Sequence, residues 1–256
     1  NIDAMAGFEY YDTFNKGFSA AGRGAPTDDF MDLSYTSTEE GARSIDSWHV
    51  RQRIMSLFAR VNYDFDSKYL ISFSIRNDGF SKLAKETRWG VFPGVSAGWV
   101  ISREDFMKNF SDVLSFAKLR ASYGLNGNVS PNWVGAYTVQ GAYGSTQYSG
   151  NKGFLLSILP NPGLMWEKSR TMEVGLDLSF MANKYNVNLT FYDRFTKDKY
   201  ANITLPSHSG VGVYTSNNGS MRNTGFEIET SFRFLDTKNW KWNLNFNAAY
   251  NINTIV

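Results

Sequence analysis

The feature that most constrains the fold is an alternation of apolar and polar residues, sustained for about ten residues at a time. In residues 55–65 the odd positions, from Met55 to Phe65, are apolar or aromatic, and the even positions are polar apart from Phe58. Successive side chains of a strand point to opposite faces, so such a run predicts a strand with one apolar and one polar face. The same period recurs in residues 69–76, 172–180, 185–192, 226–234 and 240–250.

Weaker runs of the same kind complete the set. Residues 91–101 and 116–125 alternate less strictly, and residues 2–11 form a further candidate strand. The sequence therefore predicts an all-β fold of about nine antiparallel strands.

A soluble sandwich and a membrane barrel both alternate, but they place their aromatic residues differently. A sandwich has its largest side chains in mid-strand, within the core. A membrane barrel turns its apolar face to lipid and borders that face with aromatic girdles. In this chain 16% of the residues are aromatic, and several stand on the apolar face beside short turns, which favours a transmembrane barrel. The expected membrane-interface aromatics are Phe65, Tyr69, Phe180, Tyr185, Phe234 and Trp240.

The connections alternate in length, which assigns a side of the membrane to each end of the strands. Short periplasmic turns and long extracellular loops are typical of outer-membrane barrels. Short turns are expected at 66–68, 181–184 and 235–239, and outer loops at 14–50, 77–88, 126–164 and 200–221. The exception is 102–115, a longer periplasmic connection whose start, Ser102 to Asp105, predicts a capped short helix.

Composition excludes several classes of protein. The chain has no cysteine, so disulfides and thiolate zinc sites are excluded. The formal charge is only +2 and the basic residues are scattered, which argues against a nucleic-acid partner. No run approaches the roughly 18 apolar residues of a spanning helix, so a membrane would have to be crossed by a closed barrel. Residues 1–7 lack the basic start and apolar stretch of a signal peptide.

Five runs of residues stand out as motifs. They are Leu57 to Phe65 (LFARVNYDF) with Lys68-Tyr69-Leu70, Arg88 to Trp99 (RWGVFPGVSAGW), Leu119 to Gly124 (LRASYG), Asn161 to Ser169 (NPGLMWEKS) and Asn223 to Glu229 (NTGFEIE). In this order they resemble the barrel of the SusC/RagA family of TonB-dependent transporters from Bacteroidetes. The resemblance covers most of the chain from about Leu57 to Tyr250.

The resemblance implies a barrel of about 22 strands around a plug domain, together with a TonB box. It also implies a SusD-like surface lipoprotein that closes over the barrel as a lid. Nine strands are too few for such a barrel, whose strand count is usually even and whose edges must pair. We therefore expect residues 1–256 to form part of a TonB-dependent receptor β-barrel domain, without the plug domain, the TonB box and the C-terminal strands.

Charged residues on the polar face are expected to line the lumen. Glu227 and Glu229 stand two residues apart, a spacing that distance alone would allow for a glycosidase pair. Their alternation with apolar residues favours a lumen wall instead, shared with Arg60, Arg233 and Lys241. No catalytic residues, no cofactor and no enzymatic activity are expected.

A metal site is not expected either. The two histidines, His49 and His208, both fall in expected loops, and neither has further ligands at a metal-binding spacing.

The aromatic residues of the expected outer loops are the candidates for substrate binding. Aromatic rings among small polar residues can stack on sugar rings or hold peptides. They can also pack the loop on itself or against a lid partner, and the sequence leaves this alternative open. The candidates are Trp133, Tyr137, Tyr143, Tyr148 and Trp48.

These features predict a multi-pass protein of the outer membrane that imports a nutrient, an oligosaccharide or a peptide, by TonB-dependent transport. The expected partners are the SusD-like lipoprotein, TonB through the N-terminal part of the protein, and outer-membrane lipid. Two alternatives remain open at this point. One is a passive porin-type channel, and the other is a soluble all-β carbohydrate-binding module.

Overall fold

The computed structural model describes residues 1–29 and 31–256, which are mostly β-strand. The strands are β1 (Ile2–Gly22), β2 (Arg43–Phe65), β3 (Tyr69–Phe80), β4 (Trp89–Val100), β5 (Leu114–Asn128), β6 (Ala142–Tyr148), β7 (Asn151–Ile158), β8 (Glu167–Phe180), β9 (Tyr185–Thr204), β10 (Val213–Asp236) and β11 (Lys241–Ile255). Four short 3₁₀ helices connect them: η1 (Leu33–Tyr35), η2 (Ile101–Arg103), η3 (Asp105–Phe110) and η4 (Ser207–Ser209). Among the described residues, no helix is long and apolar enough to span a membrane.

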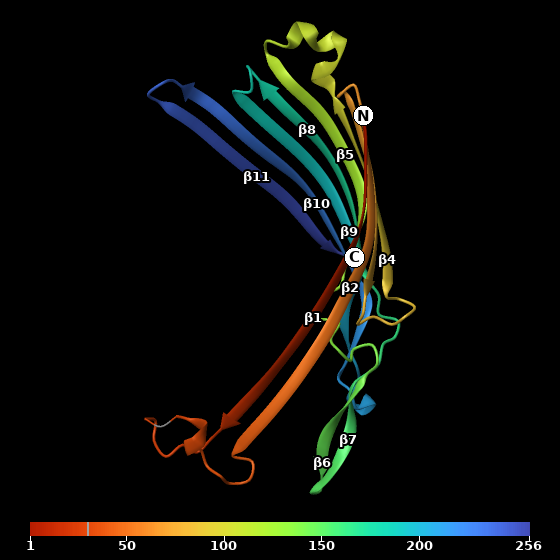
Figure 1. Ribbon diagram of the computed structural model, residues 1–256, viewed down its shortest axis with the longest axis vertical. Helices are drawn as coiled ribbons and strands as arrows, with labels where there is room; N and C mark the ends of the chain where they lie inside the picture. The colour runs from red at the N-terminus through yellow and green to blue at the C-terminus, as the bar shows by residue number, and fades with distance from the viewer. Residues whose placement is uncertain (30) are drawn as a thin grey trace.

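Nine of the strands form one antiparallel sheet in the order β1-β2-β3-β4-β5-β8-β9-β10-β11, while β6 and β7 form a separate hairpin. The sheet is strongly curved, and its edge strands β1 and β11 are not paired with each other within residues 1–29 and 31–256 (Figure 1). The prediction of nine antiparallel strands is confirmed. Because each strand pairs with the next sheet strand along the chain, the topology is a simple meander.

The connections separate by length onto the two ends of the sheet. One end, the turn end, holds the connections 66–68, 101–113, 181–184 and 237–240. The opposite end, the loop end, holds 23–42, 81–88, 129–166 with the β6–β7 hairpin, and 205–212. In Figure 1 the turn end lies at the top and the hairpin at the bottom. The expected alternation of short and long connections is therefore present.

Left-handed backbone makes the tight turns possible. Asp66 and Ser67 have φ of 54° and 51°, and the Asp64 carboxylate accepts a hydrogen bond from the Ser67 backbone N–H at 2.7 Å. Met181 and Ala182 adopt φ of 50° and 54° in the same way. Consecutive residues with positive φ turn the chain with a twist that matches the flanking strands.

The strand register sorts the side chains onto two faces. Phe65 pairs with Tyr69, and Tyr69 pairs with Trp99, so all three lie on one face. This face is convex, and its apolar side chains are open to the surroundings; Phe73, in mid-strand, is 58% exposed. We call these apolar convex positions the apolar band. The polar positions share the concave face.

Several strands extend beyond the expected limits. The expected loop 14–50 is wrong, because β1 continues to Gly22 and β2 begins at Arg43, with Asp12 paired to Arg53 and Phe14 to Arg51. Pairing continues past the point where apolar alternation stops, since backbone hydrogen bonds do not depend on side-chain polarity. Likewise the loop expected at 200–221 shrinks to 205–212 as β9 and β10 run on.

The connection 101–113 forms the expected short helix, η3, but without the expected cap, because no side chain caps its first turn. The Glu104 carboxylate instead accepts hydrogen bonds from the Tyr69 hydroxyl at 2.7 Å and from Trp99 Nε1 at 3.0 Å. These two hydrogen bonds, with Lys68 nearby, hold the pKa of Glu104 below its usual value. The connection is thus fastened to the rim of the apolar band.

A buried apolar cluster lies at the loop end, where outer loops fold over the strand ends. The ring of Trp166 packs edge-on against Phe80 and Phe92, with centroids 6.4 and 5.5 Å away. We call this group the loop-end cluster. Its members are Phe80, Leu83, Phe92, Val134, Val139, Leu164, Trp166 and Tyr200.

Candidate functional site

The concave face is the candidate site, because it is hollowed and carries charges of both signs. Three hollows of about 530, 510 and 600 Å³ lie along it. A polar, concave surface of this kind can hold solutes and water. The largest hollow is lined by Arg120, Glu173, Asn188, Thr190, Tyr192, Arg194, Asn223, Glu227, Glu229 and Asn251.

Arg120 organises the largest hollow by lying flat across two strands. Its Nη2 donates to Thr190 Oγ1 at 2.6 Å, and its Nε lies 3.2 Å from an oxygen of Asp177. The guanidinium crosses Gly175, where a Cβ atom would lie 2.4 Å from Arg120 Cζ. Only glycine leaves room for this contact between neighbouring strands.

Tyr192 lies across a glycine in the same manner. A Cβ atom on Gly225 would lie 2.4 Å from the Tyr192 hydroxyl oxygen, and that hydroxyl donates to Asn251 Oδ1 at 3.1 Å. Both long side chains therefore follow the wall instead of projecting from it.

A second polar network surrounds Arg76, nearer the loop end. Arg76 Nε donates to Asp78 at 2.6 Å, and its Nη2 donates to Glu9 at 2.7 Å and to Ser56 Oγ at 2.9 Å. The guanidinium also stands over the Phe58 ring, 5.5 Å from its centroid, which is a favourable cation–π distance. Phe58, the one large exception to the sequence alternation, is therefore a concave-face residue.

The residues expected to line the lumen lie on this face. Arg60 lines the hollow next to Arg76, and Glu227 and Glu229 line the largest one. Arg233 lies near the turn end, 3.5 Å from Asp236, which pairs across the strands with Lys241. Their contact with solute remains a prediction.

The Asn161 to Ser169 motif fastens the loops to the sheet. Trp166 Nε1 donates to the Arg88 carbonyl at 2.8 Å. The buried Glu167 carboxylate accepts from the Tyr200 backbone N–H at 2.9 Å and from Asn128 Nδ2 at 2.7 Å. Asn161 Nδ2 donates to the Thr215 carbonyl at 2.8 Å. One short segment thereby joins β5, β9, β10 and the loop before β4.

Comparisons with known proteins match this architecture along the whole chain. Residues 1–255 match the family model described as TonB dependent receptor-like, beta-barrel. The chain belongs to the TonB-dependent receptor β-barrel family.

Individual relatives agree with that family. The alignment with TonB-dependent receptor P3 of Formosa agariphila covers 100% of this chain at 31% identity. The alignment with TonB-dependent receptor SusC of Bacteroides thetaiotaomicron covers 87% of this chain at 32% identity. A structure of the RagAB peptide importer in the closed-closed state superposes with a TM-score of 0.86 at 29% identity, over 99% of the chain. The chain spans 26%, 23% and 28% of these three proteins, about a quarter of each.

Family membership assigns the curved sheet to a barrel wall and gives each end of its strands a side. The sheet is part of the wall of an outer-membrane-type barrel, with the turn end as the periplasmic end and the loop end as the extracellular end. The expected resemblance to the SusC/RagA family is confirmed by the match to SusC and to RagAB.

The aromatic residues expected at the membrane interface lie near the turn end, several of them close to one another. Phe65 and Tyr69 lie 6.3 Å apart, and so do Tyr185 and Phe234; Phe180 pairs with Tyr185. Trp240 precedes β11 in the turn and is 76% exposed, whereas Trp242 packs on Phe234 at 5.0 Å. The expected strand start at Trp240 is thus one residue early, because the Trp240 backbone is bonded within the turn: its N–H donates to Thr237 Oγ1 at 3.0 Å, and its carbonyl accepts from the Thr237 N–H at 2.8 Å. Contact of these rings with the membrane interface remains a prediction.

The outer-loop aromatics divide into two groups. Trp133 is partly buried against the loop-end cluster, so this ring packs its own loop. Tyr137, Tyr143 and Tyr148 are exposed, the latter two on the β6–β7 hairpin. A role in substrate binding remains a prediction for them.

Trp48 was expected in a loop, and that expectation is wrong: it belongs to β2, with its ring against Gly17 of β1. His49 is on the same strand, 6.2 Å from the Phe14 ring, and His208 is in η4. Across the described residues, no group of three or more histidine, cysteine or acidic residues could hold a metal ion.

Sequence reasoning missed the central side chains of the site. Arg76 and Arg120 are ordinary polar positions in the alternation, and their partners come from strands distant in the sequence. The one available signal was Phe58, whose departure from the alternation marks an aromatic residue on the concave face.

Proposed function

We propose that the protein containing this chain imports a nutrient, an oligosaccharide or a peptide, across the outer membrane by TonB-dependent transport. The observation that carries the proposal is the match to the barrels of SusC and RagAB over nearly the whole chain. RagAB is a peptide importer, and the related SusC is a TonB-dependent receptor. The activity concerns the whole protein, of which this chain is one part of the wall.

The concave wall supports this function because its polar, charged and aromatic groups suit a range of solutes rather than one particular solute. Arg120, Glu173 and Glu227 supply charges of both signs, and Tyr192 supplies a flat ring in the same hollow. Peptides can pair with both charges, while sugar rings can stack on the aromatic side chain and bond to the polar groups.

Partners and location belong to the same proposal. A SusD-like lipoprotein is expected over the extracellular end, where Tyr137, Tyr143 and Tyr148 are exposed. TonB is expected to act through the N-terminal part of the protein, and the strands are expected to cross the outer membrane many times. Like its relatives, the protein is expected to be a transporter without enzymatic activity.

Uptake measurements test the proposal. Cells that carry the full-length gene would be given labelled neutral oligosaccharides or labelled tryptic casein peptides, with and without a protonophore. We expect uptake of one class, and we expect it to stop when the proton gradient collapses or when the gene for the partner lipoprotein is deleted. Uptake that continues without the gradient would instead support the porin-type alternative.

A further inference from the structure

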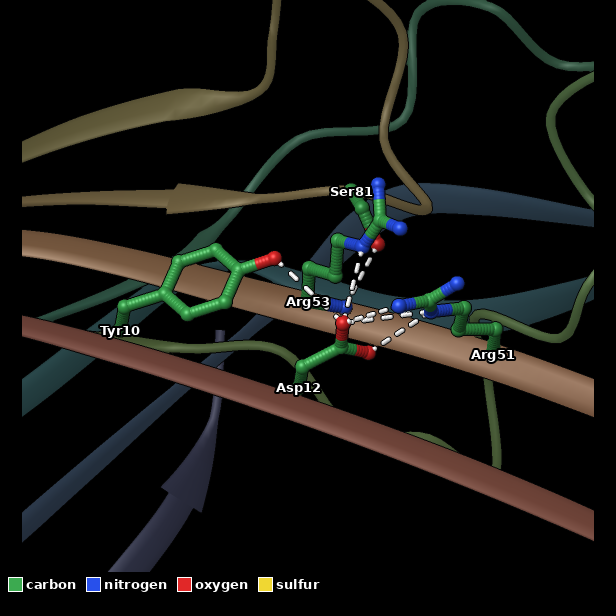
Figure 2. Close-up of polar contacts among 5 residues, drawn as sticks. All are labelled: Tyr10, Asp12, Arg51, Arg53 and Ser81. Atoms are coloured by element: carbon green, nitrogen blue, oxygen red, sulfur yellow. Dashed lines mark hydrogen bonds and ion pairs between the residues drawn. The ribbon is translucent and has the colours of Figure 1, made fainter.

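A cluster of arginine and aspartate lies on the convex face, outside the proposed solute path. Asp12 of β1 accepts hydrogen bonds from two arginines of β2, Arg51 and Arg53 (Figure 2). The Nε atoms of Arg51 and Arg53 lie 2.9 and 3.2 Å from oxygens of Asp12. Tyr10 donates its hydroxyl to Asp12 at 3.4 Å, and Ser81 accepts from the Arg53 backbone N–H at 2.9 Å. We call Asp12, Arg51 and Arg53 the first triad.

A second triad of the same composition stands on β8, β9 and β10. Arg222 Nε lies 2.6 Å from one oxygen of Asp193, and Arg170 Nη2 lies 3.6 Å from the other. Thr224 donates its hydroxyl to Asp193 at 2.9 Å. Both triads place one aspartate between two arginines, although they arise from different strands.

Both triads border the apolar band on its extracellular side. Along β2 the convex positions from Phe65 to Met55 are apolar or aromatic, and the next convex position is Arg53. Along β8 the convex positions from Phe180 to Met172 are apolar, and the next is Arg170. The band of such barrels is about 25 Å tall and faces the hydrocarbon of the membrane. The triads therefore lie at the level of the outer-leaflet head groups.

The charges of each triad do not cancel. Two guanidinium groups and one carboxylate leave one net positive charge in each. Asp12 and Asp193 are mostly covered, with side-chain exposures of 23% and 13%, whereas Arg53 and Arg222 are 48% and 56% exposed. The aspartate holds each of these two arginines through Nε, and no hydrogen bond from their terminal nitrogens is found among the described residues. Those nitrogens remain available to an outside acceptor.

We propose that each triad binds a phosphate group of a phosphorylated glycolipid in the outer leaflet of the membrane. Guanidinium groups pair with phosphate through two parallel hydrogen bonds, and a neighbouring aspartate fixes their orientation. Basic clusters at a membrane surface attract anionic head groups. Charged side chains are tolerated at the edge of the apolar band far better than at its middle. The aspartates act as positioning residues, and the arginines contact the phosphate.

Native mass spectrometry of the full-length protein in detergent tests this assignment. After delipidation the protein would be offered diphosphoryl lipid A, the same lipid without its phosphates, or inorganic phosphate. We expect diphosphoryl lipid A to bind, with one fewer molecule retained by Arg51→Gln/Arg53→Gln and one fewer by Arg170→Gln/Arg222→Gln. Arg60→Gln, an arginine of the concave wall, is the matched control and keeps both molecules.

Three results would overturn the assignment: unchanged lipid counts in both double variants, equal binding of the dephosphorylated lipid, or displacement of the lipid by equimolar inorganic phosphate.

Folding is checked by heat-modifiable electrophoretic mobility. If a glutamine variant does not fold, the Arg→Lys pairs replace it. Lysine keeps the charge without the two-pronged geometry, so we expect affinity about tenfold weaker than that of the unchanged protein. Unchanged affinity in the lysine pairs would contradict the proposed role of the guanidinium groups. None of these readouts depends on transport, so they stand or fall separately from the proposed import.

Discussion

The loop-end cluster and the apolar band handle apolar side chains in opposite ways. At the loop end Phe80, Leu164 and Trp166 are at most 7% exposed, because loops fold over them. In the band Phe73 and Phe8 remain 58% and 60% exposed. The difference follows from the solvent: lipid accepts apolar side chains directly, whereas a segment in water must build its own core. We therefore expect one chain to use protein packing at its loop end and lipid contact along its middle.

The largest expected effect comes from emptying the loop-end cluster. Trp166→Ala removes a ring that packs on Phe80 and Phe92 and donates to the Arg88 carbonyl. We expect a loss of about 3–5 kcal/mol in the stability of the extracellular end. The measurement is the thermal midpoint of the full-length protein in detergent, together with the rate of protease cleavage in the outer loops.

Trp48→Ala is the matched control, since it makes the same substitution at a side chain that is 52% exposed. We expect a much smaller change there. Equal losses at Trp166 and Trp48 would show that the cluster is not the anchor of the loops.

A charge in the middle of the apolar band tests whether that face meets lipid. Phe73→Arg places a cation on the convex face, and Ser72→Arg places the same cation on the concave face one residue away, opposite the uncharged Asn62 and Ser96. Folding into lipid vesicles, followed by denaturant titration, should cost about 2–4 kcal/mol for the first and close to nothing for the second. The reverse order would place lipid on the other face.

Removal of the buried Glu167 carboxylate at the loop end has a somewhat smaller expected effect. Glu167→Leu leaves the Tyr200 N–H and the Asn128 amide without their acceptor. We expect a cost of about 1–3 kcal/mol in denaturant unfolding of the full-length protein. Glu173→Leu, on the wet concave wall, is the control, and a cost there as large as at Glu167 would refute the distinction.

The smallest expected effect is a pH dependence at the periplasmic rim of the band. The folded-state pKa of Glu104 is lowered by its hydrogen bonds from Tyr69 and Trp99. Its stabilising contribution is therefore present above the unfolded-state pKa and is lost as the pH falls through the folded-state value. We expect the thermal midpoints of the unchanged protein and Glu104→Gln to differ at about pH 7 and to converge as the pH falls below the unfolded-state pKa, about 4.3, and through the lower folded-state pKa. A gap that stays constant over this range would exclude the carboxylate as its source.

The sequence predicted the band far better than the loop end. Lipid-facing strands obey a period of two, so residues such as Met55 to Phe65 reveal their own face. The outer parts of β1 and β2 were missed because Asp12 and Arg51 interrupt the apolar face while backbone pairing continues. Alternation reports the environment of a strand rather than the strand itself.

The candidate site was predictable only as a list of wall positions. Arg60, Glu227 and Glu229 followed from face and charge. The contact of Arg120 with Thr190 depends on the register of β5, β8 and β9, which a single strand does not encode. The loop-end cluster gathers Phe80, Phe92 and Trp166 from three segments for the same reason.

Arg120 and Tyr192, which lie flat over Gly175 and Gly225, affect the width of the space in front of the concave wall. A methyl group at either position would lift Arg120 or Tyr192 off the wall and stand it in the open space. The aperture at that depth is therefore governed by residues that contribute no side chain at all. If solutes pass along this wall as proposed, the addition of one carbon atom narrows their size range while every polar group of the wall stays chemically the same.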